Sequence, residues 1–205
     1  MTAPLQRPFN QRIRSWGLRA LFLLALPVLL FTRSAWPSGG LVFETLETLG
    51  IFLIVAAVVG RFWSILYIGG RKNHEVVRDG PYSICRHPLY LFSTVGVLGF
   101  GLMLGSLTLA LGLGLAVGLI LSATAAREEA WLRQEMGPAY AAYEAEVPRI
   151  WPRISNFRTP PTIPVTLRPL RVNFADALVF MALLPVAELL EALRDTGWLP
   201  TVPLF

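Results

Sequence analysis

The chain has little charge and almost no cysteine. Only 15% of its 205 residues are charged, while 54% are hydrophobic and the mean hydropathy is +0.56. An ordinary soluble domain has about 25% charged residues, so too few polar residues remain to cover a soluble globule or to keep a disordered chain solvated. The single cysteine, Cys85, excludes an intramolecular disulfide and a cysteine-based zinc cage, and no metal site is predicted.

Long apolar segments predict instead an all-α integral membrane protein with about five transmembrane helices. A helix needs roughly 20 mainly apolar residues to cross a bilayer. Residues 87–126 contain no Asp, Glu, Lys or Arg, which is enough for two crossings joined at a tight turn, Gly105-Ser106. The last candidate carries acidic residues and is either a span packed against its neighbours or an interfacial helix. The candidate spans are residues 16–36, 41–60, 88–104, 107–126 and 172–193.

The basic residues are distributed unevenly along the chain. Sixteen of the eighteen fall in residues 1–19, 61–86 and 127–171. The positive-inside rule then places the N-terminus and both long loops in the cytoplasm. The net charge of +5 therefore reflects topology, and no nucleic-acid partner is expected. We expect a bacterial inner-membrane protein with its active site on the cytoplasmic side and an uncleaved first span.

The chain divides into three predicted parts. Residues 1–60 form two N-terminal transmembrane helices. Residues 61–155 form a core that contains the helical hairpin 88–126 and a cytoplasmic segment after it. Residues 156–205 form a proline-rich connector and a final apolar helix.

Two polar segments flank the hairpin and are therefore expected to be neighbours. In the first, Pro88 suits the first turn of the third span and His87 its N-cap. The free N–H groups of that helix start would favour an anionic group. In the second, Glu128 and Glu129 follow the fourth span and emerge at the same membrane face. A carboxylate near a helix C-terminus is opposed by the helix dipole, which indicates a partner.

These residues resemble the isoprenylcysteine carboxyl methyltransferase family, together with the related membrane phospholipid methyltransferases. The resemblance covers about residues 61–153. A His-x-x-Val element stands at His74 to Val77. The matching positions further on are Gly80-Pro81-Tyr82, Arg86-His87-Pro88-Leu89-Tyr90, Glu128-Glu129, Leu132, Gly137, Tyr140, Tyr143 and Val147-Pro148.

The resemblance implies a helical membrane enzyme with a cytoplasmic site for S-adenosyl-L-methionine. The carboxylate of that cofactor suits His87, its ammonium and ribose hydroxyls suit Glu128, and its sulfonium suits a tyrosine. By position, the implied cofactor-binding residues are His74, Glu75, Val76, Val77, Tyr82, His87, Pro88, Leu89, Tyr90 and Glu128.

The acceptor is less defined by the resemblance. Carboxyl-methylating members have an Arg one helical turn before the Glu pair, where this chain has Thr124. Arg127 is a candidate substitute for holding a carboxylate, and Glu129 or His87 a candidate base for an amine or hydroxyl acceptor. The expected partner is a lipidic or prenylated small molecule, or a membrane lipid. The alternatives are a phospholipid amine N-methyltransferase and a non-catalytic membrane scaffold, and the sequence does not indicate the oligomeric state.

Overall fold

The structure, a computed structural model, describes residues 12–71, 75–195 and 200–205 and is mostly helical. Predicted site residue His74 lies outside the described residues. The elements in chain order are α1 (Arg12–Phe31), β1 (Thr32–Ser34), α2 (Leu41–Ile68), α3 (Pro81–Ile84), α4 (Pro88–Met103), α5 (Leu107–Met136), α6 (Pro138–Glu146), the 3-10 turn η1 (Ile154–Asn156), α7 (Leu167–Asp195) and β2 (Val202–Leu204).

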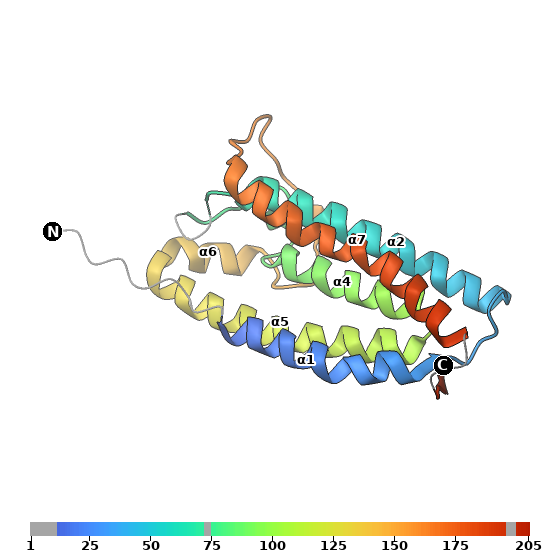
Figure 1. Ribbon diagram of the computed structural model, residues 1–205. Coiled ribbons are helices and arrows are strands. Elements are labelled where there is room, and N and C mark those ends of the chain that lie inside the picture. Colours follow the sequence, from blue (N-terminus) through green and yellow to red (C-terminus); the bar gives the residue numbers. More distant parts are fainter. Residues whose placement is uncertain (1–11, 72–74, 196–199) are drawn as a thin grey trace.

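The long helices form an elongated bundle with α4 at its centre (Figure 1). α2 has its most extensive contacts with α4, and α4 packs in turn on α5. α1 lies along α5, while α7 packs on α2 and also touches α4 and α1. The start of α4 and the end of α5 thus lie at one end of the bundle, here called the motif end. The turn between α4 and α5 lies at the other, here called the turn end.

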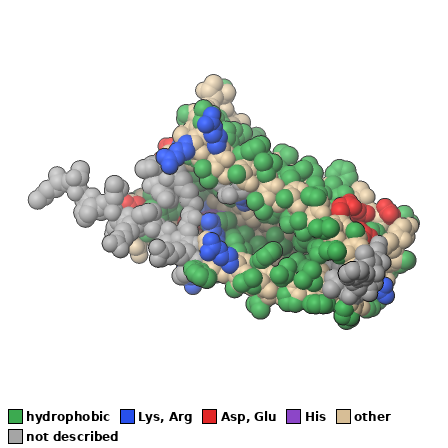
Figure 2. Space-filling model, viewed as in Figure 1, with side chains coloured by type: hydrophobic (Ala, Val, Ile, Leu, Met, Phe, Trp, Pro, Cys, Tyr) green, Lys and Arg blue, Asp and Glu red, His purple; other side chains and the backbone are tan. Residues whose placement is uncertain are grey.

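Three of the described helices are long and apolar enough to cross a membrane: Arg14–Phe31, Leu41–Ile68 and Leu107–Met136. α4 is also apolar but has 16 residues. Hydrophobic side chains cover much of the visible face, with basic side chains mainly toward the motif end and a group of acidic side chains at the turn end (Figure 2). The chain is therefore a helical membrane protein, whereas the count of five spans and the orientation stay predictions.

The hairpin turn forms where the sequence predicted it. Gly105 has a positive φ of 66°, a conformation that costs glycine little because it has no Cβ. Ser106 is the N-cap of α5 and accepts a hydrogen bond from the Leu109 amide. Close packing then holds the hairpin, because a Cβ at Gly101 would collide with the backbone of Ala110.

Several of the predicted helix boundaries are wrong. The first helix does not continue to residue 36 but ends at Phe31, where the strand β1 follows. The second helix does not end at residue 60 but continues to Ile68, so Arg61 lies within α2 and not in a cytoplasmic loop. The apolar pattern weakens after Gly60, but the helix is extended by Ser64 and Ile65, which are buried against neighbouring helices. The last helix likewise begins at Leu167 and not at residue 172.

The turn end is closed by the C-terminal residues. β2 pairs in parallel with β1, so that Arg33 lies opposite Pro203. The carbonyl oxygen of Phe205 accepts hydrogen bonds from the Thr108 amide and the Ser106 hydroxyl. A cavity of about 350 Å³ lies beside this sheet, lined in part by Trp36.

Candidate active site

The start of α4 carries the first site residues. His87 is the N-cap residue of α4 and Pro88 occupies its first turn, as the sequence predicted. The helix start offers fewer free amides than expected, however. The amides of Tyr90 and Leu91 bond back to the His87 carbonyl, and the His87 amide donates to the Arg149 carbonyl. An anion at this helix start would therefore meet mainly side chains and the helix dipole.

Backbone hydrogen bonds join the two polar segments. The Arg86 amide donates to Pro148 O at 2.9 Å, and the Arg153 amide donates to Ile84 O at 2.9 Å. The residues before α4 therefore run beside the residues after α6, although about 60 positions separate them. This pairing confirms that the two segments are neighbours.

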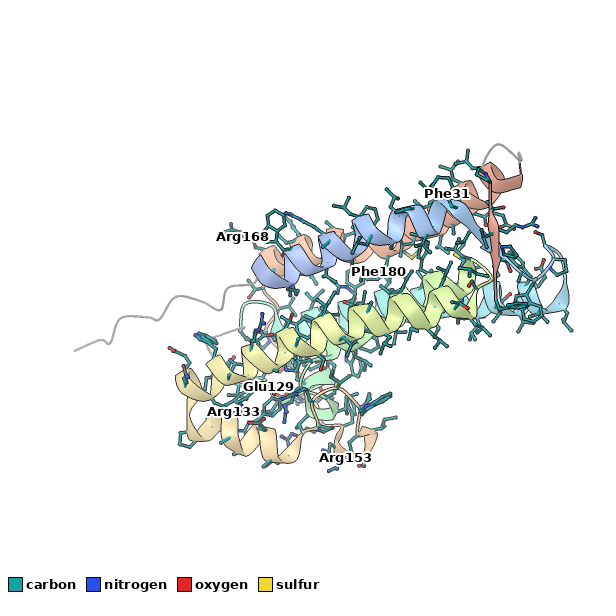
Figure 3. All side chains as sticks on the ribbon, turned by 90° about the horizontal axis from the view of Figure 1, so that it is seen from below. Phe31, Glu129, Arg133, Arg153, Arg168 and Phe180 are labelled. Carbon is teal, nitrogen blue, oxygen red and sulfur yellow. The ribbon has the colours of Figure 1, made fainter. Side chains whose placement is uncertain are left out.

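Glu129 is the centre of a charge network at the motif end. Its carboxylate is fully buried on α5. One carboxylate oxygen accepts from Arg86 Nε at 2.9 Å and lies 3.1 Å from His87 Nε2. The other accepts from Arg149 Nε at 2.9 Å and Nη2 at 2.6 Å. Figure 3 shows Glu129 between α5 and the chain that follows α6, with Arg133 close by and Arg153 further along that chain.

This network changes the expected role of Glu129. A general base needs a lone pair that faces the proton to be removed, but both oxygens of Glu129 already face cationic or N–H donors. The geometry favours a positioning role, in which Glu129 holds Arg86 and Arg149 together. Arg86 continues the connection, because its Nη1 donates to the carbonyls of Glu144 at 2.9 Å and Val147 at 3.0 Å.

Glu128 faces a different environment from Glu129. It accepts a hydrogen bond from the Tyr90 hydroxyl at 2.9 Å, and its Oε2 lies 3.9 Å from His87 Nδ1. The His87 ring stacks on the Tyr90 ring with centroids 5.2 Å apart. Since a carboxylate can only accept, the proton of a neutral His87 is assigned to Nε2, beside Glu129. The Nδ1 lone pair then lies toward Glu128.

Most predicted cofactor residues line one pocket at the motif end. Pocket residues from the first segment are Glu75, Val76, Val77, Tyr82, His87, Leu89 and Tyr90, and Glu128 joins them from α5. Pro88 is buried within the first turn of α4. Leu132, a motif position that was not assigned to the cofactor, also lines the pocket, as do Ile68 and Met136, which the sequence did not select.

Predicted catalytic residue Arg127 lies elsewhere. Its side chain is exposed, and it is not among the residues that line the pocket. The adjacent Glu128 faces inward because successive residues of a helix differ by about 100° around its axis. The assignment of Arg127 as the residue that holds the acceptor stays a prediction.

Buried neutral groups complete the wall of the pocket. Burial raises the pKa of the Tyr82 and Tyr143 phenols well above the ordinary value, so both stay protonated. The Tyr143 hydroxyl donates to Tyr82 O at 2.8 Å, which ties α6 to α3. Burial also raises the pKa of the Cys85 thiol to about 12, so this cysteine is unreactive at neutral pH.

The donor set fits the polar groups of S-adenosylmethionine. A buried carboxylate, Glu128, is oriented by Tyr90 and suits an ammonium or ribose hydroxyls. The rings of Tyr82 and Tyr90 suit a sulfonium. The enclosed space is about 80 Å³, below the 300–1,000 Å³ of typical ligand pockets, so such a ligand would extend through the open mouth.

Fold and site together define a helical membrane protein with a partly polar pocket at one end of its bundle. Residues 38–139 match the family described as phospholipid methyltransferase. Protein-S-isoprenylcysteine O-methyltransferase of Schizosaccharomyces pombe is 33% identical over 103 residues, which are 49% of this chain and 44% of that protein. The chain belongs to this family of membrane methyltransferases, which confirms the resemblance seen in the sequence.

Two further relatives match nearly the whole chain. The cobalt-zinc-cadmium resistance protein CzcN of Cupriavidus metallidurans is 39% identical over 193 residues, which are 94% of this chain and 88% of that protein. The nickel-cobalt-cadmium resistance protein NccN of Alcaligenes xylosoxydans xylosoxydans is 37% identical over 192 residues, with the same two shares. No solved structure matches the chain. Within the residues that the structure describes, no three His, Cys, Asp or Glu side chains are grouped so as to hold a metal ion.

Proposed function

We propose that the protein is an S-adenosylmethionine-dependent methyltransferase of the bacterial inner membrane that methylates a lipidic acceptor at the motif-end pocket. The observation that carries the proposal is the Tyr90–Glu128–His87 group, which lines a pocket in a chain of the methyltransferase family. The basic residues near this end support a cytoplasmic orientation.

Methyl transfer requires mainly that the methyl donor and the acceptor are aligned. When bound, S-adenosylmethionine supplies a methyl group on an already activated sulfonium. Orientation of the reacting groups can contribute about 7–11 kcal/mol to lowering a barrier. In this proposal Glu128 and Tyr90 hold the polar groups of the cofactor. Glu129, which is itself held by Arg86 and Arg149, keeps His87 in place by direct contact.

The acceptor decides whether a base is needed. A carboxylate attacks the methyl carbon directly, whereas an amine or hydroxyl must also lose a proton. Of the two candidate bases, His87 is the better placed, because it lines the pocket whereas Glu129 does not. A prenylcysteine-like carboxylate and a phospholipid amine are both acceptors in this proposal. The metal-resistance names of two relatives suggest membranes of metal-exposed bacteria as the acceptor source.

Calorimetric titration of the detergent-solubilised protein with S-adenosylmethionine tests the site. Glu128→Gln removes a charged acceptor worth about 1.5–3 kcal/mol, so we expect the Kd to rise about 10- to 100-fold. Glu135→Gln, at an exposed position on the same helix, is the matched control and should leave the Kd unchanged. Folded wild-type protein that binds no cofactor would refute the proposal.

Transfer of a labelled methyl group to membrane extracts separates an enzyme from a scaffold. An enzyme labels lipid or protein in the extract, and the labelled product identifies the acceptor. Cofactor binding without transfer to any fraction would favour the non-catalytic scaffold.

A further inference from the structure

The chain that follows α6 carries large apolar side chains on its outer surface. Trp151 is 84% exposed and Ile154, in the turn η1, is 78% exposed. Phe157 is 48% exposed, and its ring packs against α2 at 6.0 Å from the ring of Trp63. Exposed apolar residues that stand singly are normal, whereas several close together mark a contact surface. Residues 149–158 are called the outer segment below.

Backbone hydrogen bonds hold the outer segment beside the start of α4. The His87 amide donates to Arg149 O at 3.1 Å, and the Arg153 amide donates to Ile84 O at 2.9 Å. Trp151 and Ile154 lie between or next to these bonded positions. Their side chains are therefore presented at a fixed level of the bundle, set by the start of α4.

That level is the edge of the apolar layer. The charge-free residues 87–126 end on α5 just before Glu128, whose carboxylate accepts from Tyr90 in the first turn of α4. α4 has 16 residues, so it is about 24 Å long, whereas the hydrocarbon core of a bilayer is about 30 Å thick. A helix this short starts at or inside the edge of that core. The outer segment, tied to this start, therefore lies where membrane and water meet.

The outer segment also lies on a flank of the bundle. Figure 3 shows Arg153 on the opposite side of the bundle from Arg168, and nearer the middle of the bundle's length than Arg133. The flanks of a membrane-spanning bundle face lipid, whereas its ends face water. The outer segment therefore borders the lipid and does not project only into water.

A basic side chain accompanies the apolar ones. Arg149 and Arg158 are paired with Glu129 and Glu146. The Arg153 side chain, in contrast, is exposed and makes no hydrogen bond or ion pair within the described part of the chain. Tryptophan is typical of membrane interfaces, where its ring sits at the level of the headgroups, and a basic residue there is attracted to anionic lipid. Composition and position thus agree.

We propose that the outer segment is an interfacial anchor that docks on anionic phospholipid. Trp151 and Ile154 enter the boundary between headgroups and acyl chains, and the Arg153 guanidinium binds the anionic headgroup. The occupant is a lipid and not a protein, because the apolar side chains lie at the bilayer edge and the unpaired group beside them is a cation. Lipid docking depends neither on methyl transfer nor on a cofactor, so it stands or falls apart from the proposed function.

Spin labels in nanodiscs that contain phosphatidylglycerol test the depth of the segment. The label is placed at Ile154→Cys, and the parent chain gives the background because Cys85 is fully buried. Oxygen concentrates in the bilayer, whereas a nickel chelate stays in water. We expect oxygen to reach this label better than nickel does. The control is Gln134→Cys, exposed on α5 five residues beyond Glu129, where nickel should have the better access.

Native mass spectrometry in detergent tests the charge of the lipid. The probes are dioctanoyl phosphatidylglycerol, which is anionic, and dioctanoyl phosphatidylcholine, which is zwitterionic. We expect the wild-type protein to prefer the anionic probe. Arg153→Gln should weaken binding of that probe by about fivefold, which is equivalent to about 1 kcal/mol for one basic residue at an anionic surface. Arg153→Lys should keep most of the affinity, because the charge is retained.

Arg33→Gln, at an exposed position of the turn end, is the matched control and should leave the preference close to that of the wild type. All these positions are exposed, so the variants should fold, and an unchanged Tm checks this. A label at Ile154→Cys that nickel reaches better than oxygen does would overturn the anchor. Equal binding of the two probes, or equal losses in Arg153→Gln and Arg33→Gln, would overturn the assignment to anionic lipid. A dimer that Trp151→Ser dissolves would assign the surface to a second copy of the chain instead.

Discussion

The two ends of the bundle are held together by different interactions. At the motif end, a fully buried carboxylate gathers two arginines and a histidine from separate segments. At the turn end, the segments are held by backbone contacts instead, through a two-stranded sheet and closely packed glycines. The larger cavity lies at the turn end, yet the family motifs and the buried charges meet at the smaller one. Cavity size alone would have pointed to the turn end, away from the family motifs, whereas chemistry depends on which groups converge.

The largest expected effect is at Glu129. Glu129→Ala leaves Arg86 and Arg149 without their shared carboxylate, and breaking a buried pair costs about 3–5 kcal/mol. Thermal unfolding in detergent should show a large fall in Tm. Glu135→Ala, at an exposed position on α5, is the control and should change stability little. Equal effects of the two substitutions would mean that the motif end does not depend on its charge network.

The stability of the turn end should depend on side-chain volume instead of on charge. Gly101→Ala forces a Cβ into the backbone of Ala110, and overpacking of this kind costs about 1–3 kcal/mol. Gly112→Ala is the matched control on the same hairpin, because its Cβ would meet open space. We expect Tm to fall for the first and to hold or rise for the second, and the reverse order would contradict the packing of α4 on α5.

The smallest expected effect is at the exposed edge of the motif end. Arg133 donates two hydrogen bonds of 2.6 Å to Glu144 and holds the pKa of that carboxyl below its ordinary value of 4.5. A lowered folded pKa means that the pair stabilises the protein above the unfolded pKa and stops doing so as the pH falls through the folded one. The Tm difference between wild type and Glu144→Gln should therefore be small near pH 7 and shrink toward pH 3. A difference that grows on acidification would contradict this sign.

Local patterns were sufficient to predict the helical membrane class and the hairpin. The charge-free stretch and the Gly105-Ser106 turn depend on neighbouring residues alone, so they could be read directly. The second helix was predicted too short because hydropathy drops at Arg61, whereas tertiary packing keeps α2 helical to Ile68. Hydropathy windows do not detect a charge that neighbouring helices accommodate.

The sequence predicted which candidate residues gather at the motif end, but not how each of them is placed there. Glu128 and Glu129 are adjacent in the sequence. Glu128 lines the pocket, whereas Glu129 is fully buried at the centre of the charge network. Arg127 was also a candidate, for holding a carboxylate, but its side chain is exposed. These differences depend on how α5 is rotated about its axis against α4, and no local pattern specifies that rotation.

By itself, the sequence determined the membrane class, the tight turn and the segments that carry the family motifs, because these features depend on short stretches of residues. Only the tertiary structure decided that Arg149 reaches Glu129, that the C-terminal strand pairs with β1 at the turn end, and that Arg61 bonds to Ser93. Each of these contacts joins residues that are at least 20 positions apart in the chain. They form only when the helices have packed with a particular register and rotation.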